Sequence, residues 1–401
     1  MRALHRFYVA SDEEVRTGET TDIYFTRTEK ILKEKGLEHV RAVAEVTVPE
    51  LPMNWPWGTL CGVEEEVYLF EGRNVDVYAM PEGTIFRPLD YRGVPVPVMR
   101  IEGEYGKFAV LETALLGLVC QASGIATAAS RVRKVAGDRL ALSFGVRRMH
   151  PSIAPMVSRA AYIGGLDGVS CVLSAKRMGI KATGTMPHSL IIIFRDQVKA
   201  WKAFDELMPK DVPRIALTDT YLDEKVESLM AVEALGEKLW GIRLDTPGSR
   251  KGSFEDIVRE VRWELDLKGF KDVKIFVSGG LDEKSVKSLS EAGADGFGVG
   301  TRVSDAPTIN FAMDIVEVEG SPSAKRGKFG GKKNVWRCPK CLIDIVLPFS
   351  ASRPVCPKCG SKTEPILKPL IMNGKLATKL PKATEIRSYV LKQLEKVTLE
   401  I

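Results

Sequence analysis

The chain has 401 residues, 44% of them hydrophobic, and a net charge of +6 at pH 7. This length exceeds one ordinary compact domain, and the mild charge suits an anionic metabolite better than nucleic acid, which usually requires a broad basic field. No run of 18 or more apolar residues occurs, and the first residues lack the apolar core of a signal peptide. We therefore expect a cytoplasmic protein that does not span a membrane.

Residues 1–112 are expected to form a strand-rich N-terminal domain that opens with a short helix. Ser11 is followed by three acidic residues, which is the pattern of a helix N-cap. Beyond it, apolar and polar residues alternate in short runs separated by Pro and Gly, as in β-strands. The predicted strands are residues 41–48, 65–70 and 75–80.

The next predicted domain, residues 113–318, begins with a long helix of small apolar residues that starts at Glu112 and extends to Val132. Short apolar strand candidates then alternate with amphipathic helices that begin with Ser or Asp. This alternation predicts an α/β fold with a parallel sheet, and its six or seven units favour an incomplete or modified β/α barrel. The strand candidates are 140–144, 168–173, 189–194, 215–217, 241–244, 274–277 and 296–299, and the clearest helices are 223–239, 253–269 and 282–293.

Polar or glycine residues directly follow most of these predicted strands. In a β/α barrel the loops after the strands converge on one face, where catalytic groups lie. One Asp or Thr in such a place is equally typical of a helix cap, but five such sites in succession favour an active site. The five groups are Phe144 to Arg147, Thr218 to Thr220, Asp245 with Thr246, Ser278 to Gly280, and Gly298 to Thr301.

The two glycine-rich groups after the last two strands indicate a phosphate site, with ordinary glycine turns as the alternative. Barrels often bind phosphate at this place through backbone N–H groups, and a side chain would keep the backbone away from the oxygens. A lone glycine-rich match of this kind is weak evidence for a dinucleotide-binding fold, and that fold is rejected. The predicted cradle consists of Ser278, Gly279, Gly280, Gly298, Gly300 and Thr301.

His188, Asp219 and Asp245 are the candidate catalytic residues. His188 precedes the predicted strand 189–194, and a histidine there acts as a nucleophile, as a base or only as a structural residue. Asp219 and Asp245 end neighbouring predicted strands, so their carboxylates are suited to ribose hydroxyls or to Mg²⁺. Arg243 lies two residues before Asp245 and therefore shares its side of the strand.

Four cysteines near the C-terminus form two CxxC pairs with fourteen residues between the pairs. Two such turns supply four thiolates, which predicts a closed, structural Zn²⁺ site, with iron as the alternative. The site defines a small zinc-binding module at residues 319–370, followed by a tail at 371–401 with a surface helix. The predicted ligands are Cys338, Cys341, Cys356 and Cys359, and the other cysteines, Cys61, Cys120 and Cys171, are expected to be inert buried thiols.

Several of these segments, taken in order through nearly the whole chain, resemble nicotinate phosphoribosyltransferases of the type II phosphoribosyltransferase family. The likeness is to the archaeal form with a zinc-bearing tail, and the related nicotinamide enzyme is a more distant match. The segments that carry it are ASDEEVRTGETTDIYF, YAMPEGTIFRP, SFGVRRMHP, AYIGGLDGVS, GTMPHSL, IRLDTPGSRKG, FVSGGLDE and GFGVGT.

The resemblance implies a reaction in NAD salvage that makes nicotinate mononucleotide. Phosphoribosyl pyrophosphate loses pyrophosphate while the pyridine nitrogen of nicotinate attacks the ribose, with Mg²⁺ assisting. The family couples this step to ATP hydrolysis through a phosphohistidine, and His188 occupies that motif.

The resemblance also assigns places to individual residues. Phe144 would lie beneath the pyridine ring, with Arg147 near its carboxylate and Asp167 near the base. Tyr24 would cover the other face of the ring from a second subunit, which implies a homodimer. Asp245 would approach the ribose and Arg243 a phosphate, the glycine cradle would hold the 5′-phosphate, and Lys325 and Lys328 would reach pyrophosphate unless they form only a solvated loop.

Three other functions remain open at this point. Quinolinate phosphoribosyltransferase would need more basic residues for two carboxylates and would have no use for a phosphorylated His188. A nucleic-acid-binding protein would use the zinc ribbon and the basic stretch 324–333. An inactive relative would keep only the fold. The sequence also leaves the choice between nicotinate and nicotinamide open.

Overall fold

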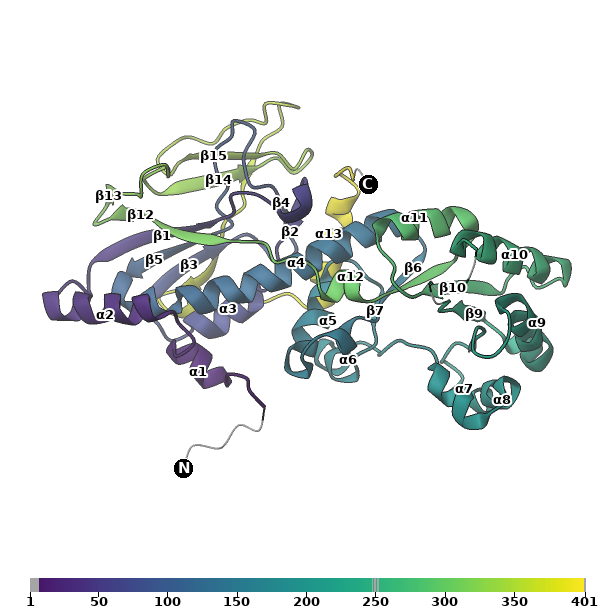
Figure 1. The fold of residues 1–401 in the computed structure, drawn as a ribbon. Helices are drawn as coiled ribbons and strands as arrows, with labels where there is room; N and C mark the ends of the chain where they lie inside the picture. The colour runs from purple at the N-terminus through teal and green to yellow at the C-terminus, as the bar shows by residue number, and fades with distance from the viewer. Residues whose placement is uncertain (1–6, 247, 249, 251, 400–401) are drawn as a thin grey trace. The chain divides into compact units, whose positions relative to one another are not determined.

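The computed structural model describes residues 7–246, 248, 250 and 252–399, and its contacts divide the chain into two compact units (Figure 1). The strand-rich unit contains the chain up to Thr127, Ile163–Gly165 and Ala306–Leu399. The parallel-sheet unit contains Ala128–Tyr162 and Leu166–Asp305. The four domain boundaries expected from the sequence stay predictions.

The strand-rich unit is built on a seven-stranded antiparallel sheet that draws strands from both ends of the chain. Its centre pairs β1 with β5 and β12, and β3 joins β5 to β17. The sheet order is β13 (Ser321–Pro322), β12 (Ala312–Val318), β1 (Arg41–Thr47), β5 (Met99–Glu104), β3 (Val75–Ala79), β17 (Lys368–Met372) and β18 (Lys375–Leu376).

Smaller sheets and four helices complete this unit. Buried polar contacts join the cysteine-bearing strands to it: the Lys333 ammonium lies 2.8 Å from the Glu45 carboxylate, and the Val346 N–H donates to Asp90 at 3.0 Å. The elements are β2 (Gly58–Thr59), β4 (Ile85–Phe86), β14 (Lys333–Arg337), β15 (Asp344–Pro348), β16 (Glu364–Pro365), α1 (Asp12–Thr17), α2 (Ile23–Lys35), α3 (Val63–Phe70) and α13 (Ala383–Leu394).

The long predicted helix is α4, Glu112–Ala136, and its small residues allow close packing. A Cβ on Gly124 would lie 2.3 Å from the carbonyl oxygen of Pro307, so only glycine fits there. The helical stretch Ala109–Ala136 has a mean hydropathy of 1.6 and is long and apolar enough to cross a membrane. Half of its apolar window is buried, and a core helix passes the same test.

The parallel-sheet unit has six strands in the order β7-β6-β11-β10-β9-β8, and every neighbouring pair is parallel. Among the described residues the edge strands β7 and β8 do not pair with each other, so the sheet is an incomplete barrel, as predicted. The strands are β6 (Leu140–Ser143), β7 (Gly168–Val169), β8 (Ile215–Leu217), β9 (Gly241–Leu244), β10 (Lys274–Ser278) and β11 (Gly296–Val299).

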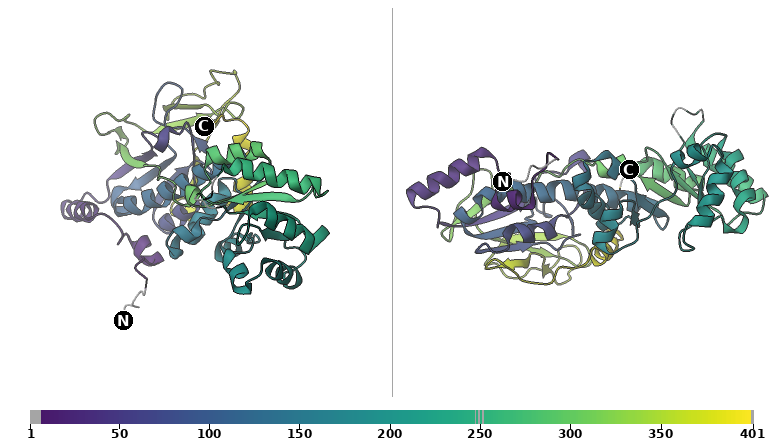
Figure 2. Two further views of the ribbon diagram at one scale, coloured as in Figure 1. Left: turned by 45° about the vertical axis from the view of Figure 1, so that its right-hand side comes forward. Right: turned by 90° about the horizontal axis from the view of Figure 1, so that it is seen from below.

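Helices pack around this sheet, as the two views of Figure 2 show for the teal and green segments. Ser or Asp caps begin α9, α10 and α11 as expected: Asp223, Ser253 and Asp282 each accept a backbone N–H of the first turn. The helices are α5 (Ala154–Ile163), α6 (Val172–Met178), α7 (His188–Phe194), α8 (Gln197–Leu207), α9 (Glu224–Leu235), α10 (Phe254–Leu267), α11 (Glu283–Ala292) and α12 (Thr301–Ser304).

Two predicted strands are wrong, and a third is shorter than predicted. Residues 189–194 belong to α7, and Ile191 is the residue of this β-branched run that is buried. Arg195 ends the helix in the left-handed region, with φ 55°. Residues 65–70 belong to α3, since six residues are too few to separate a period of 2 from 3.6. The run 168–173 forms only a two-residue strand before α6 begins.

Candidate active site

The carboxyl ends of the parallel strands bring most of the predicted site residues to one edge of the parallel-sheet unit. Parallel strands end on the same side, so the loops after them lie next to one another. Phe144 follows β6, Asp219 lies two residues after β8, and Asp245 follows β9. Gly279 follows β10 and Gly300 follows β11.

Arg243 on β9 is the centre of a hydrogen-bond network at this edge. Its Nε donates to the Ser278 hydroxyl at 2.9 Å, and one Nη donates to the Asp245 carboxylate at 2.9 Å. The other Nη donates to the hydroxyl of Thr185 at 2.9 Å and to the Met186 carbonyl at 3.3 Å. The Ser278 hydroxyl in turn donates to Asp245 at 2.8 Å. Arg243 thus fixes both Asp245 and the segment before His188. The sequence did not predict the contact of Arg243 with Thr185.

His188 lies between two carboxylates. Its Nε2 is 3.7 Å from Asp219 Oδ1 and 3.7 Å from Asp245 Oδ2, and its Nδ1 is 3.0 Å from the Thr220 hydroxyl. The backbone N–H of Asp245 donates to Asp219 Oδ2 at 2.5 Å, which ties the two strand ends together. The three residues predicted to be catalytic therefore lie within one group, with His188 at the first position of α7 instead of beside a strand.

Burial controls the protonation of this group. It raises the pKa of Asp219 to about 7, against the lowering effect of the Asp245 N–H. Asp219 Oδ1 is buried and has no hydrogen-bond partner among the described residues. Burial also lowers the pKa of His188, with the charge of Asp245 acting in the opposite direction. The imidazole is therefore neutral at pH 7, as a nucleophile or a metal ligand requires.

Two glycines shape the floor of the site. A Cβ on Gly298 would lie 2.4 Å from the Phe144 ring, and a Cβ on Gly145 would lie 2.6 Å from the carbonyl oxygen of Gly300. The Phe144 ring packs against Phe276 with centroids 6.3 Å apart, and the Arg243 guanidinium lies 5.7 Å from its centroid. Glycine at position 298 therefore determines where the aromatic face of Phe144 lies.

The glycine segments after β10 and β11 are joined by a buried ion cluster. Glu283, the first residue of α11, accepts from Arg302 Nε at 2.7 Å and from Arg302 Nη2 at 2.9 Å. Arg131 of α4 donates to the same carboxylate at 2.9 Å. Gly279 and Gly280 adopt φ values of 102° and 65°, which favour glycine. The sequence does not indicate this role of Glu283, because an acidic residue at the start of a helix is normally interpreted as a cap.

Asp167 makes its hydrogen bonds apart from the His188 group, and its expected place near the base stays a prediction. Its carboxylate accepts from Arg133 at 2.5 Å and from the Ala141 N–H at 2.8 Å. Ala141 lies near the start of β6, so Asp167 lies toward the amino ends of the strands, away from the predicted site edge. The local sequence contains no signal for this, because the partner arginine lies 34 residues earlier.

Arg147 and the predicted residues of the strand-rich unit are exposed or paired elsewhere. Arg147 follows β6 in an exposed turn and has no ion-pair partner among the described residues. Tyr24 lies at the start of α2 with 55% of its surface exposed. Lys325 is exposed, and the Lys328 ammonium lies 2.7 Å from the Asp314 carboxylate.

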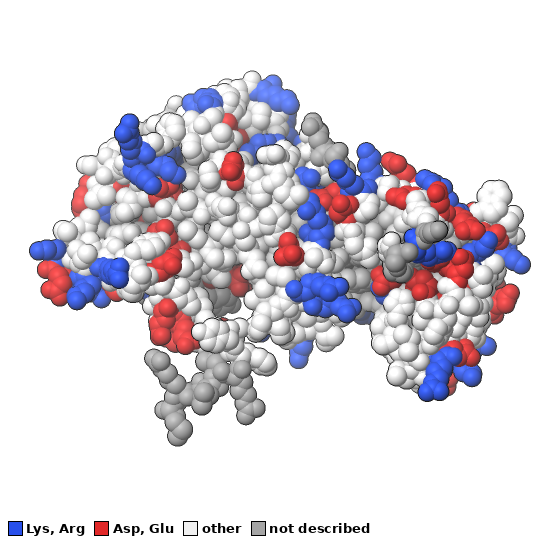
Figure 3. Space-filling model, in the orientation of Figure 1, with Lys and Arg blue, Asp and Glu red and all other residues white. Residues whose placement is uncertain are grey.

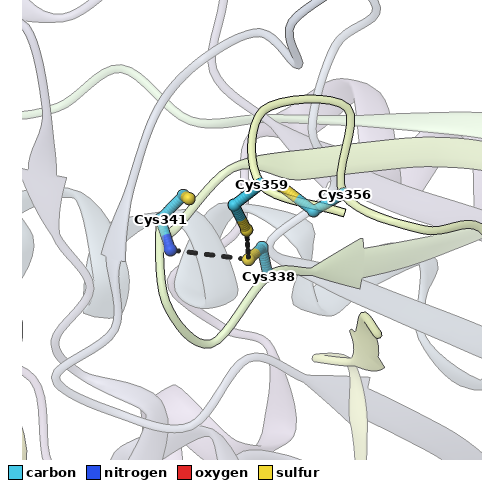
Figure 4. A group of neighbouring side chains, drawn as sticks. All are labelled: Cys338, Cys341, Cys356 and Cys359. Atoms are coloured by element: carbon cyan, nitrogen blue, oxygen red, sulfur yellow. Dashed lines mark hydrogen bonds between the residues drawn. The ribbon is translucent and has the colours of Figure 1, made fainter. Parts of the chain in front are cut away.

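The four predicted metal ligands lie together in the strand-rich unit (Figure 4). The sulfur atoms of Cys338, Cys341, Cys356 and Cys359 all lie within 4.8 Å of one another, and those of Cys338 and Cys359 are 3.6 Å apart. A tetrahedron with Zn–S bonds of about 2.3 Å has edges of about 3.8 Å, so the cluster fits a four-thiolate metal site. Lys396 donates to the Pro339 carbonyl at 2.8 Å and links this site to the end of α13.

Comparison with known proteins matches both parts of the chain to one pair of domain families. The C-terminal domain of quinolinate phosphoribosyl transferase matches residues 125–314, and its N-terminal domain matches residues 22–123. The curated nicotinate phosphoribosyltransferase pncB2 of Mycobacterium tuberculosis is 34% identical over 274 residues, covering 65% of this chain and 57% of that protein. The nicotinate phosphoribosyltransferase of Bacillus subtilis is 29% identical over 336 residues, covering 75% and 66%.

Two solved structures resemble the whole chain. The nicotinate-nucleotide pyrophosphorylase of Pyrococcus furiosus is 56% identical, with a TM-score of 0.94 over 99% of this chain and 100% of that one. Human nicotinic acid phosphoribosyltransferase shares the fold, with a TM-score of 0.74 at 22% identity over 94% of each chain.

An incomplete parallel barrel with glycine segments at the carboxyl ends of its last strands, in one chain with an antiparallel unit, defines a phosphoribosyltransferase-like architecture. The chain belongs to the nicotinate phosphoribosyltransferase family of type II phosphoribosyltransferases. It spans less than two thirds of the length of the curated relatives described above.

Proposed function

We propose that this protein is a nicotinate phosphoribosyltransferase that makes nicotinate mononucleotide from nicotinate and phosphoribosyl pyrophosphate in NAD salvage. The observation that carries the proposal is the group of His188, Asp219 and Asp245 beside the Arg243 network, in a chain of this family. The pyridine nitrogen supplies the electron pair for the new bond to the ribose anomeric carbon. The bond from that carbon to pyrophosphate breaks, and pyrophosphate leaves with its electron pair.

The edge residues have matching roles in this proposal. The backbone of the glycine segments around Gly279 and Gly300 binds the 5′-phosphate, and Phe144 packs against the pyridine ring. Arg147 pairs with the nicotinate carboxylate, a role supported by its exposed and unpaired guanidinium among the described residues. Asp245 and Asp219 provide the carboxylates that bind the ribose and Mg²⁺, which stabilises the charge on the leaving pyrophosphate.

We further propose that His188 takes a phosphoryl group from ATP. The neutral imidazole expected from its lowered pKa and its place between two carboxylates support this role. A histidine at a helix start with Nδ1 held by a hydroxyl presents the lone pair of Nε2 for attack on the terminal phosphorus of ATP, and ADP leaves with the electron pair of the broken bond.

A homodimer with shared sites is part of the proposal, with Tyr24 and the loop of Lys325 and Lys328 acting on the partner's site. It is supported by exposed apolar side chains in both units: Ile193 of α7 is 81% exposed and Val172 of α6 is 75% exposed, while Ile23 and Tyr24 of α2 are 63% and 55% exposed.

Mixing two inactive variants tests the shared site. Tyr24→Ala and Asp245→Ala homodimers would each be inactive, whereas random exchange of subunits would restore about a quarter of wild-type activity, since half of the dimers are mixed and each has one intact site. No recovery after verified subunit exchange would show that Tyr24 acts within its own chain.

We propose that the four cysteines bind Zn²⁺ in a structural role, since four thiolates leave no open position for substrate. A reducing compartment such as the cytoplasm is part of the proposal, because the four clustered cysteines bind a metal as thiolates.

Turnover with a panel of nicotinate, nicotinamide and quinolinate, each with phosphoribosyl pyrophosphate and with or without ATP, tests the main proposal. We expect turnover of nicotinate that ATP stimulates, and no turnover of nicotinate would refute the function. A His188→Ala variant should lose the ATP stimulation; a variant that keeps it would refute the phosphohistidine alone.

The quinolinate activity is the second candidate, because the matching domain families carry that name. Release of CO₂ with quinolinate would identify it. Nucleic-acid binding is disfavoured, because the basic stretch is largely neutralised: Lys328, Lys332 and Lys333 pair with Asp314, Glu102 and Glu45. The face in Figure 3 likewise shows basic and acidic side chains intermixed.

A further inference from the structure

The loop between β8 and α9 contacts both ring nitrogens of His188 through two consecutive residues. Asp219 Oδ1 lies 3.7 Å from Nε2, and the Thr220 hydroxyl lies 3.0 Å from Nδ1. The contact of Thr220 is a hydrogen bond, and no other side chain hydrogen bond of Thr220 is found within the described part of the chain. One short loop therefore supplies a contact to each nitrogen of the imidazole.

A buried carboxylate holds this loop in place. Glu227 of α9 has no exposed surface, and its two oxygens accept three successive backbone N–H groups. The donors are Thr220 at 3.1 Å and Tyr221 and Leu222 at 2.8 Å each. Hydrogen bonds to an ionised acceptor are strong, so the position of the Thr220 backbone is fixed by the fold before any substrate binds.

The two ring nitrogens differ in their contacts. Nδ1 is hydrogen-bonded to the Thr220 hydroxyl, whereas the Asp219 and Asp245 carboxylates lie 3.7 Å from Nε2, beyond hydrogen-bond distance. A histidine attacks phosphorus through an unprotonated nitrogen, and Nε2 is the nitrogen left open for this. In the proposed reaction Nδ1 therefore carries the proton and donates it to the Thr220 hydroxyl. Without that hydroxyl, the ring could rotate about its side-chain bond and exchange the two nitrogens at little cost.

We propose that Thr220 is a positioning residue for His188: its hydroxyl holds Nδ1, which carries the ring proton, so that the ring keeps one orientation and the lone pair of Nε2 stays open. Glu227 acts one step further away by holding Thr220. The consequence for turnover rests on the proposed function, in which His188 carries a phosphoryl group, but the orientation of the ring does not.

Nitrogen NMR on the full-length protein labelled with ¹⁵N-histidine tests the orientation. The chain has only four histidines, and His188→Gln identifies the signals of His188. We expect the wild-type protein to show one tautomer, protonated at Nδ1. Thr220→Val removes the hydroxyl and keeps the shape, and should give a mixture of tautomers, whereas Thr220→Ser should restore the wild-type pattern.

The kinetic arm measures ATP-stimulated formation of nicotinate mononucleotide. Thr220→Val should lower the stimulated rate about five- to tenfold, the change expected for one lost hydrogen bond, and Thr220→Ser should recover most of it. Ser288→Ala is the matched control, because it removes a side-chain hydrogen bond to Glu255 between α10 and α11 in which neither His188 nor Thr220 takes part. It should leave both the His188 signals and the rate unchanged.

The outcomes separate the two proposals. An unchanged tautomer in a folded Thr220→Val protein would overturn the role of Thr220. A wild-type protein that makes nicotinate mononucleotide without any response to ATP would refute the phosphohistidine, and the NMR arm would still decide on Thr220. Glu227→Gln provides a second variant; it should produce the tautomer mixture only in part, because it weakens the loop and keeps the hydroxyl.

Discussion

At the scale of single residues, Glu66 on α3 is the least expected group in the strand-rich unit. Its side chain is fully buried, and neither carboxylate oxygen has a hydrogen-bond partner among the described residues. Burial raises its pKa well above the ordinary value, with the charge of Glu65 adding to the effect. The folded protein therefore keeps this proton over a range of pH in which the unfolded chain has lost it.

This difference in protonation predicts how stability depends on pH. The unfolded chain loses the Glu66 proton above its ordinary pKa of about 4.3, so the contribution to stability is highest below that pH and falls as the pH rises toward the folded-state pKa. Glu66→Met, which is similar in length and apolar, should stabilise the protein at pH 8 by about 1–3 kcal/mol. The gain should shrink at pH 4.5.

Urea denaturation at the two pH values measures this effect. Glu206→Met, at an exposed position of α8, is the control and should change stability by less than about 0.5 kcal/mol at either pH. A Glu66→Met protein less stable than wild type at pH 8 would show that Glu66 has a partner in solution.

At the same scale, the sequence identified His188, Asp219 and Asp245 and the arginine that holds Asp245, but it gave no role to the other residues that position them. Thr185, Thr220 and Glu227 are common polar residues with no spacing that relates them to His188. Their contacts span 58, 32 and up to 7 positions along the chain, and the sequence alone gives no measure of such distances.

At the scale of elements, glycine positions decide how closely the strands and helices approach. Gly298→Ala should displace the Phe144 ring, because the added Cβ would lie 2.4 Å from it. We expect a loss of about 1–3 kcal/mol in stability and a raised KM for nicotinate. Thermal denaturation and steady-state kinetics measure the two effects.

Gly117→Ala is the matched control for this substitution. Gly117 lies on an exposed position of α4, and a Cβ there meets nothing within 4 Å. The change should stabilise the helix by about 0.5–1 kcal/mol without altering KM. If both variants behaved alike, the contact of Gly298 with Phe144 would not matter.

The ion cluster of Glu283 joins the two glycine segments, so it should influence the phosphate site. Glu283→Gln leaves two arginines without their shared carboxylate, and we expect a stability loss of about 3–5 kcal/mol. The KM for phosphoribosyl pyrophosphate should rise more than the KM for nicotinate. Arg302→Lys keeps the charge but loses the bidentate contact with Glu283. It should raise the KM for phosphoribosyl pyrophosphate by a smaller factor.

Asp205→Asn is the control for the cluster. It breaks the Asp205–Arg214 contact of 2.9 Å, which lies before β8 at the amino ends of the strands. It should lower the thermal midpoint without changing either KM. An unchanged KM for phosphoribosyl pyrophosphate in folded Glu283→Gln would indicate that the cluster serves stability alone.

Helices and strands were predicted correctly where a capping residue or a long amphipathic segment was present. They were predicted poorly in short apolar runs. The helices after Ser11, Asp223, Ser253 and Asp282 begin where predicted, because a capping side chain is a local signal. The run 189–194 forms a helix in which Ile191 is the buried residue. Which side chain of such a short run is buried depends on packing against other elements, and the run itself does not indicate it.

At the scale of the whole molecule, the cysteine cluster connects distant parts of the strand-rich unit. Lys396 reaches the carbonyl of Pro339 beside the cluster, and Arg87 donates to the carbonyl of Leu342 at 3.3 Å. Removal of a bound metal should therefore loosen both the tail helix and the segment around β4, well beyond the cluster itself.

A strong chelator should lower the thermal midpoint by several degrees, and added Zn²⁺ should restore it. Elemental analysis should find one zinc per chain, and Cys356→Ser should reduce this content and match the chelated protein in stability. A cluster that contains no metal when the protein is purified in zinc-supplemented medium would contradict the structural zinc site.

The sequence by itself determined the α/β class, the alternation that makes an incomplete barrel, the cysteine cluster and most residues of the candidate site. These features depend on local periodicity, on spacing and on the order of motifs, all of which are visible along the sequence itself. Only the tertiary structure decided that Asp167 pairs with Arg133 at the other end of the strands, that α7 is a helix, and that Glu227 and Glu283 hold the site loops. Those outcomes depend on which distant groups meet in space, and burial and charge at these contacts are set only when the chain has folded.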